Sequence, residues 1–176
     1  GAKAGIDCDP KDSAAKEALK RFMAFVHDYL DKHWVTAEDL GVSQQQIDDV
    51  FAELGLGQSY HAAIMRSDNV EVTMERVRAG LNAPVDGGYL LGDVVGGYGV
   101  AQACLAWARA TGRDVTETTV AIQGIGTMGG AAAWYLHEAG MKVVQVSDAV
   151  SSLWRTDGAG LDIPELLKLR NEYNEI

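Results

Sequence analysis

The stretch Thr118–Gly129, TTVAIQGIGTMG, decides the fold class of this chain. In residues 119–123 β-branched residues alternate with others, which predicts a buried strand. Gly124, Gly126 and Gly129 then follow in the spacing GxGxxG, and a helix is expected over residues 128–138. A glycine fingerprint between a strand and a helix is typical of α/β domains that bind dinucleotides.

Each glycine of this motif has its own expected role. Gly124 permits a tight turn, Gly126 lets a pyrophosphate approach the backbone, and Gly129 lets helix and strand pack closely. The first helical residues, Thr127 and Met128, would offer unpaired N–H groups to the phosphates. We therefore predict a Rossmann-type doubly wound domain that binds a dinucleotide, with a plain structural turn as the alternative interpretation.

Asp148 follows the next expected strand, residues 142–146. It lies roughly 20 residues after the fingerprint, where an acid can accept hydrogen bonds from the adenosine ribose hydroxyls, which favours NAD over NADP. The same carboxylate can equally cap the loop that follows it. Arg155 is close enough in sequence to keep NADP open as the alternative cofactor.

The composition favours a small-molecule partner. The 176 residues are 47% hydrophobic, and the formal net charge is −10. Such a surface repels nucleic acid and anionic lipid, and the basic residues form no stripe. No apolar run is long enough for a membrane span, and nothing at the start resembles a signal peptide. Cys8, Cys104 and the four histidines lack metal-ligand spacing, so we expect no metal site. The two cysteines are far apart in sequence, so we expect no disulfide, as in a reducing compartment. Together with the missing span and signal peptide, this predicts a cytoplasmic location.

Local patterns predict further helices. Residues 12–33 carry apolar side chains at spacings of three and four, which predicts one long amphipathic helix. Ser43 and Gln46 form a capping box that opens a second helix, and Gly55 ends it. Another helix is expected over residues 98–110.

Residues 55–92 are rich in Gly, Asn, Asp and Ser around a short helical segment, so we place a connection between domains there. We expect residues 1–92 to form a partial catalytic and substrate domain with a hinge connection. Residues 93–176 would form a partial nucleotide-binding domain, in which Asp162 caps the last helix. Only two strands are predicted after Gly112, too few for a stable sheet. The chain is therefore expected to be a fragment, a partly recorded chain or a piece that assembles with a complementary polypeptide.

Three segments in order resemble the glutamate/leucine/phenylalanine/valine dehydrogenase family. The opening GAKAGIDCDP resembles the family's glycine-rich lysine motif, with Lys3 as the lysine. WVTAEDLG, residues 34–41, resembles its second catalytic element, with Asp39 as the acid, in wording closest to the leucine, phenylalanine and valine branch. The sequence from Thr119 onward is similar to the start of the family's nucleotide domain.

The resemblance implies a homo-oligomeric enzyme that uses NAD or NADP to convert an L-amino acid reversibly to its 2-oxo acid and ammonia. It also implies an α/β architecture, with the end of an N-terminal substrate and dimerisation domain followed by the start of the Rossmann-type domain. Lys3 would stabilise the substrate carbonyl oxygen, and Asp39 would handle protons on the incoming ammonia. The small residues around Lys3 predict that it is shielded from water.

Two positions depart from the family pattern. A threonine usually follows the catalytic Asp-x-Gly, and another stands in an Ala/Val-Thr-Ala/Gly-x-Gly-Val segment, but this chain has Val42 and Gly96. Both hydroxyls are lost, which motivates an alternative: a noncatalytic nucleotide-binding or assembly module derived from the same family. A Rossmann-type oxidoreductase of different chemistry is a third interpretation, but it leaves the first forty residues unexplained. Retention of Lys3 and Asp39 favours the dehydrogenase.

Overall fold

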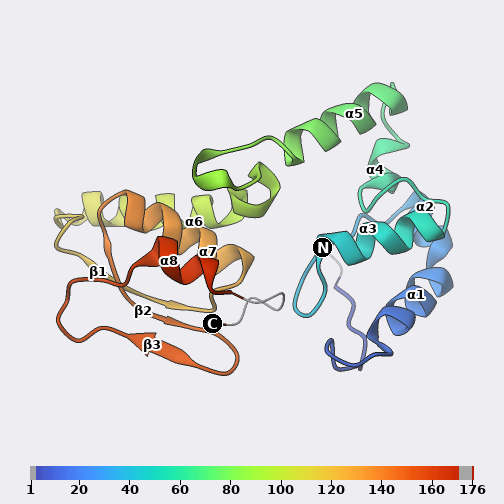
Figure 1. Cartoon of the computed structure of the whole chain (residues 1–176). Helices are drawn as coiled ribbons and strands as arrows, with labels where there is room; N and C mark the ends of the chain where they lie inside the picture. Colours follow the sequence, from blue (N-terminus) through green and yellow to red (C-terminus); the bar gives the residue numbers. More distant parts are fainter. Residues whose placement is uncertain (1–2, 171–175) are drawn as a thin grey trace. The chain divides into compact units, whose positions relative to one another are not determined.

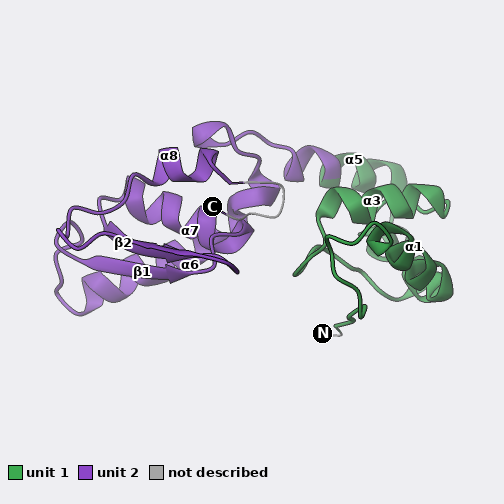
Figure 2. Cartoon of the chain, turned by 60° about the horizontal axis from the view of Figure 1, so that its bottom comes forward, with its two compact units in different colours: residues 1–77 green, residues 78–176 purple. Residues whose placement is uncertain are grey.

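The computed structural model describes residues 3–170 and residue 176. Its elements are α1 (Ala15–Phe25), α2 (His27–Lys32), α3 (Gln44–Glu53), α4 (His61–Ile64), α5 (Val70–Leu81), the 3₁₀ turn η1 (Asp86–Gly88), α6 (Leu91–Ala110), β1 (Thr119–Gln123), α7 (Thr127–Glu138), β2 (Lys142–Ser147), β3 (Ser152–Trp154) and α8 (Ile163–Lys168) (Figure 1). The chain divides into two compact units, residues 1–77 and 78–176 (Figure 2). No helix among the described residues has the length and apolar character needed to cross a membrane.

The first unit is helical. The predicted single helix over residues 12–33 is wrong, because the chain leaves helical geometry at Val26 (φ −99°, ψ 17°), between α1 and α2. Met23 before the break and Leu30 after it are both buried in one core, so the apolar spacing continues across the break and hides it. The buried members of this core are Leu19, Met23, Leu30, Ile47, Val50, Phe51 and Leu56.

The predicted start and end of α3 are confirmed. The Ser43 hydroxyl accepts a hydrogen bond from the Gln46 backbone N–H at 3.2 Å, and the Ser43 N–H donates to Gln46 Oε1 at 2.9 Å. This capping box satisfies two N–H groups that the first helical turn leaves without partners. Gly55 follows the helix with a φ of +76°, the left-handed conformation that glycine adopts at helix ends.

The segment 55–92 is more helical than its composition predicts. It holds α4 and α5, and α5 buries none of its residues. No core therefore selects an apolar stripe along α5, which leaves little periodicity from which to predict its length. The division between the two units falls at Val77, within α5. The functional boundary after residue 92 stays a prediction, because compact units and functional domains need not coincide.

The second unit is α/β with a small mixed sheet of strand order β1-β2-β3. β1 and β2 are parallel, with Ile122 opposite Val146, and α7 connects them along the chain. β3 runs antiparallel to β2, with Leu153 opposite Val146. The sequence predicts β1 and β2 but not β3, because β3 is three residues long and all three are exposed. Such a strand lacks the alternation that marks a half-buried strand. The predicted burial of β1 is wrong: β1 lies at the edge of this sheet, and its residues alternate between exposed and half-buried.

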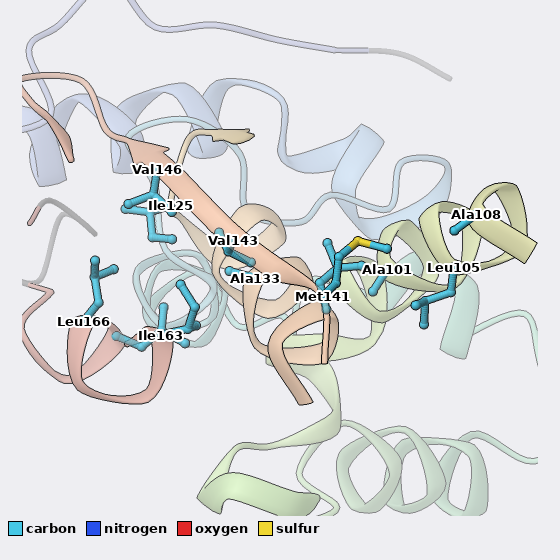
Figure 3. Packing of buried hydrophobic residues seen from close by; sticks show 12 residues of the cluster. Ala101, Leu105, Ala108, Ile125, Ala133, Met141, Val143, Val146, Ile163 and Leu166 are labelled. Carbon is cyan, nitrogen blue, oxygen red and sulfur yellow. The ribbon is translucent and has the colours of Figure 1, made fainter. Parts of the chain in front are cut away.

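Side chains from β2, α6, α7 and α8 meet in the core of this unit (Figure 3). Its buried members are Ala101, Leu105, Ala108, Ile125, Ala133, Leu136, Met141, Val143, Val146, Ile163, Leu166 and Leu167. α6 begins at Leu91, earlier than the predicted residue 98, although glycines normally disfavour helix interiors. Gly97 explains this start, because a Cβ there would lie only 2.4 Å from Ala131 Cβ on α7. Close packing of α6 on α7 therefore outweighs the low helix propensity of glycine.

Candidate functional site

The structure brings Lys3 and Asp39 together. The Lys3 ammonium donates a hydrogen bond to Asp39 Oδ2 at 2.7 Å, across 36 positions of sequence. The Lys3 side chain is 85% exposed and the Asp39 side chain 59% exposed. The described residues of the first unit do not by themselves shield Lys3, so its shielding in a closing cleft stays a prediction. The pair is open to solvent and to a ligand.

Hydrogen bonds within residues 39–42 stabilise the turn that carries Asp39. The Leu40 N–H donates to Asp39 Oδ1 at 2.9 Å, and the Val42 N–H donates to the Asp39 carbonyl at 3.2 Å. Gly41 has a φ of +77°, and a Cβ there would lie 3.0 Å from Cβ of Pro10. The Asp-Pro end of the lysine motif thus packs directly against the turn of the aspartate, which fixes the two segments beside each other.

The pKa of the Asp39 carboxyl is lowered, first by the hydrogen bond from Lys3, then by the Leu40 N–H and by the charge of Lys3. The ionised carboxylate is therefore the resting form at neutral pH, and it is a hydrogen-bond acceptor. The pair borders a cavity of about 540 Å³ in the first unit. Apolar side chains line much of it, among them Phe22 and Trp34, whose rings meet edge to face at 6.2 Å.

The two positions that depart from the family pattern both have packing roles. Val42 packs against the core of the first unit, where its methyl groups suit an apolar environment better than a hydroxyl would. Gly96 lies under the side chain of Met128, and a Cβ at Gly96 would be 2.4 Å from the Met128 sulfur. A threonine at residue 96 therefore needs Met128 to move.

The glycine fingerprint has the geometry that its spacing predicts. Gly124 has a φ of +86°, which only glycine adopts readily, and its N–H donates to the Ser147 carbonyl at 2.9 Å. A Cβ at Gly129 would lie 1.7 Å from the Gly124 carbonyl oxygen, so no other residue fits there. A Cβ at Gly126 would meet nothing within 4 Å and would project into open space.

This arrangement fits a dinucleotide. Gly126 leaves free the space that an approaching pyrophosphate needs, and it is also the N-cap of α7, with no side-chain cap. The first N–H groups of a helix, here those of Thr127 and Met128, have no acceptor within the helix. They can donate to phosphate oxygens, and the helix dipole adds to the attraction.

Asp148 caps the loop after β2. Its Oδ1 accepts hydrogen bonds from the N–H groups of Val150 and Ser151 at 2.8 and 2.6 Å. Its Oδ2 accepts from the Ile176 N–H at 2.7 Å. These bonds lower the pKa of the Asp148 carboxyl to about 2, the Ile176 N–H contributing most. The structure thus displays the capping alternative, and the contact with a ribose stays a prediction.

Arg170 contacts the glycine fingerprint, although no motif in the sequence indicates it. Its Nη1 donates to the carbonyl oxygens of Ile125 and Gly126, at 3.0 and 3.4 Å, inside the glycine fingerprint. Burial lowers the pKa of the guanidinium. No local pattern could single out this residue, because a basic side chain shortly after a short helix is ordinary, and the partners lie more than forty residues earlier.

Part of the chain matches a known protein family. The family model for glutamate/leucine/phenylalanine/valine dehydrogenase matches residues 87–176, which include α6, the glycine fingerprint and Asp148. The chain belongs to this family. The match confirms the sequence resemblance over the second half of the chain; Lys3 and Asp39 lie outside the matched range.

The chain is similar to glutamate dehydrogenases of other organisms. The cryptic catabolic NAD-specific glutamate dehydrogenase GudB of Bacillus subtilis is 30% identical over 187 aligned positions, which cover 100% of this chain and 39% of GudB. Among solved structures, the hetero-hexameric glutamate dehydrogenase from Thermus thermophilus, in its Leu-bound form, matches 87% of this chain and 33% of its own, with a TM-score of 0.56 and 22% identity. At that identity the likeness concerns the fold alone. The chain spans well under half the length of each of these proteins.

Proposed function

We propose that this chain is the part of an amino-acid dehydrogenase that carries its catalytic pair and its pyrophosphate loop. The reaction would be the reversible oxidative deamination of an L-amino acid to its 2-oxo acid and ammonia. The observation that carries this proposal is the 2.7 Å contact between Lys3 Nζ and Asp39 Oδ2. Two residues assigned separately to the chemistry, far apart in sequence, lie within one hydrogen bond of each other.

Each member of the pair has a role that its chemistry suits. The Lys3 ammonium would donate a hydrogen bond to the substrate carbonyl oxygen and stabilise the negative charge that develops there. The Asp39 carboxylate, held ionised by Lys3 and the Leu40 N–H, would accept a proton from the substrate ammonium or its attacking ammonia. Both side chains are exposed, so the ion pair can open and a substrate can insert between the two groups.

The dinucleotide would lie on a Rossmann-type loop. Gly124 and Gly129 hold the turn, Gly126 leaves space for the pyrophosphate, and the N–H groups of Thr127 and Met128 would bind it. A bound nicotinamide would supply the hydride acceptor for the oxidation. NAD is the proposed cofactor, which the NAD specificity of the relative GudB supports, with NADP as the alternative. Asp148 would contact the ribose after giving up part of its loop cap.

The active protein would be an oligomer with a small-molecule substrate. The hexameric assembly of the Thermus thermophilus relative supports this. A homo-oligomer is proposed here.

Formation of reduced dinucleotide from a panel of L-amino acids at alkaline pH tests the proposal. It is measured by absorbance with NAD and NADP in parallel, on this chain and on any longer natural polypeptide that contains it. We expect Lys3→Ala and Asp39→Asn each to reduce turnover by at least about 100-fold, because each removes a group that acts in proton transfer or charge stabilisation. The dissociation constant for the dinucleotide should stay within about threefold, a change below about 1 kcal/mol.

Two exposed residues of the same unit provide matched controls. Lys16, whose ammonium lies 3.7 Å from Glu53, and Asp28, with a side chain 90% exposed, carry the same charges outside the pair. Lys16→Ala and Asp28→Asn should leave turnover unchanged. Turnover by Lys3→Ala and Asp39→Asn at the control rate would refute the catalytic pair. Loss of dinucleotide binding in either would contradict the division of roles between the two units.

A second candidate function is a noncatalytic nucleotide-binding or assembly module. It is favoured by Val42 and Gly96, where packing has replaced both hydroxyls of the family pattern. This candidate predicts dinucleotide binding without turnover of any amino acid, in the longest natural polypeptide as well as in this chain.

A further inference from the structure

Arg170 donates hydrogen bonds to two main-chain carbonyl oxygens of the glycine fingerprint. Its Nη1 donates to Ile125 O at 3.0 Å and more weakly to Gly126 O at 3.4 Å. Gly126 O also accepts the Gly130 N–H at 2.7 Å. The residue is half-buried and borders a cavity of about 170 Å³ that Thr127 at the start of α7 also lines. A guanidinium fixed on main-chain carbonyls in this way has an orientation set by the fold.

Gly130 makes this contact sterically possible. A Cβ at Gly130 would lie 2.6 Å from Arg170 Nη1, closer than two such atoms can approach. The second glycine of the pair Gly129-Gly130 is outside the GxGxxG spacing, so the dinucleotide motif itself does not require it. Its absent side chain is the space that the guanidinium fills.

The geometry of the amide bond links this contact to ligand binding. The Ile125 carbonyl and the Gly126 N–H belong to one planar trans peptide group, so they point in opposite directions. The same holds for the Gly126 carbonyl and the Thr127 N–H. With both carbonyls turned to Arg170, both N–H groups are turned away from it.

We propose that Arg170 is a positioning residue for the dinucleotide loop, which fixes the N–H groups of Gly126 and Thr127 for a pyrophosphate that it does not itself contact. This inference rests on the proposed dinucleotide function. The cationic donor also polarises the two peptide groups, which makes their N–H groups stronger donors.

The test compares ligand affinities of variants of the full chain. Arg170→Met keeps the length of the side chain and removes its donors, and Gly130→Ala displaces the guanidinium without removing its charge. ADP carries a pyrophosphate and adenosine does not, so the two probes separate an effect on the loop from a general loss of folding. Each variant should raise the Kd for NAD and for ADP about tenfold, because the N–H groups that bind the pyrophosphate lose their fixed orientation and part of their polarisation, and should leave the Kd for adenosine unchanged.

Two further variants sharpen the comparison. Arg170→Lys keeps the charge but lacks the planar fork, so the Kd for ADP should recover only in part. Arg109→Met removes an exposed arginine from the end of α6 and should leave every Kd unchanged. Amide NMR of the ligand-free chain gives a second readout: in Arg170→Met the resonances of Gly126 and Thr127 should move upfield, because their N–H groups are less polarised.

The outcomes separate the two proposals. If the chain binds neither NAD nor ADP, the proposed dinucleotide function is refuted and the role of Arg170 falls with it. If the chain binds them and Arg170→Met binds them equally well, the positioning role alone is refuted. Equal weakening of ADP and adenosine would also refute it, because it would assign Arg170 to the stability of the fold.

Discussion

The ring of Pro10 lies against Gly41 so closely that a Cβ on Gly41 would be 3.0 Å from Pro10 Cβ and 3.1 Å from its Cγ. This contact joins the segment of Lys3 to the turn of Asp39 by packing, in addition to their ion pair. A side chain at residue 41 would press on this ring and would be strained at a φ of +77°.

Gly41→Ala should therefore separate Lys3 and Asp39, the proposed catalytic pair. A non-glycine residue at a φ of +77° costs about 1–2 kcal/mol, and the contact with Pro10 adds to this. We expect a lower thermal midpoint and a loss of turnover comparable to that of Asp39→Asn. The matched control is Gly55→Ala, which has a φ of +76° and where a Cβ meets nothing within 4 Å. A Gly41→Ala variant as stable and active as Gly55→Ala would show that the packing does not position Asp39.

Removal of the Lys3 charge should raise the pKa of Asp39. Lys3→Met removes the first and third causes of the lowered pKa and leaves the Leu40 N–H, so the pKa should rise without reaching its ordinary value. An NMR titration of the Asp39 carboxyl carbon measures this. A carboxyl with a lowered folded-state pKa stabilises the fold above its unfolded pKa, and that contribution is lost as pH falls through the folded pKa. In Lys3→Met the pH range over which this contribution is lost should be narrower, because the folded and unfolded pKa values of Asp39 lie closer together. Lys16→Met should leave that pH range unchanged.

The second and third glycines of the fingerprint, Gly126 and Gly129, should respond differently to alanine. A Cβ at Gly129 would lie 1.7 Å from the Gly124 carbonyl oxygen, so Gly129→Ala must move the backbone and should cost about 3 kcal/mol or more. A Cβ at Gly126 meets nothing, so Gly126→Ala should cost no more than about 1 kcal/mol of capping energy and still weaken dinucleotide binding. Chemical denaturation and calorimetric titration with NAD measure the two effects. Unchanged NAD affinity in a folded Gly126→Ala variant would argue against a pyrophosphate at this glycine.

The loop after β2 should be sensitive to acid through Asp148. Its pKa of about 2 lies below the ordinary value, so its carboxylate stabilises the loop above about pH 4, and this contribution is lost as pH falls from about 4 to about 2. Asp148→Asn removes the charge that the Val150, Ser151 and Ile176 N–H groups share. Thermal midpoints should therefore be lower for the variant than for the natural chain at pH 7, and the gap should close near pH 2. A gap independent of pH would assign the effect to lost geometry and not to the charge.

Local signals in the sequence predict much of the secondary structure of the second unit. The strand 119–123, the start of α7 and the N-cap Asp162, whose carboxylate accepts the Glu165 N–H at 3.1 Å, agree with the structure. In each case the signal lies within the element or directly at its end, although the strand is completed by pairing with β2. The capping box at Ser43 belongs to the same class.

The features that the sequence did not predict lack such a local signal. Glycines at the start of α6 indicate a break in the helix when taken alone, whereas Gly97 is required by the approach of Ala131. The break at Val26 has no local signal, because the residues on both sides keep apolar spacing towards one core. β3 is too short and too exposed to show a period.

By itself the sequence determined the α/β class of the second unit and the position of the glycine fingerprint. Through its family resemblance it also singled out Lys3 and Asp39 as the candidate catalytic residues. Only the tertiary structure decided that these two side chains meet at 2.7 Å, that both are open to solvent, and that Arg170 reaches the carbonyls of the fingerprint. The physical reason is range. Capping, turn and periodicity effects act over a few residues, whereas these contacts join segments 36 to 45 residues apart, whose meeting depends on how helices and strands pack.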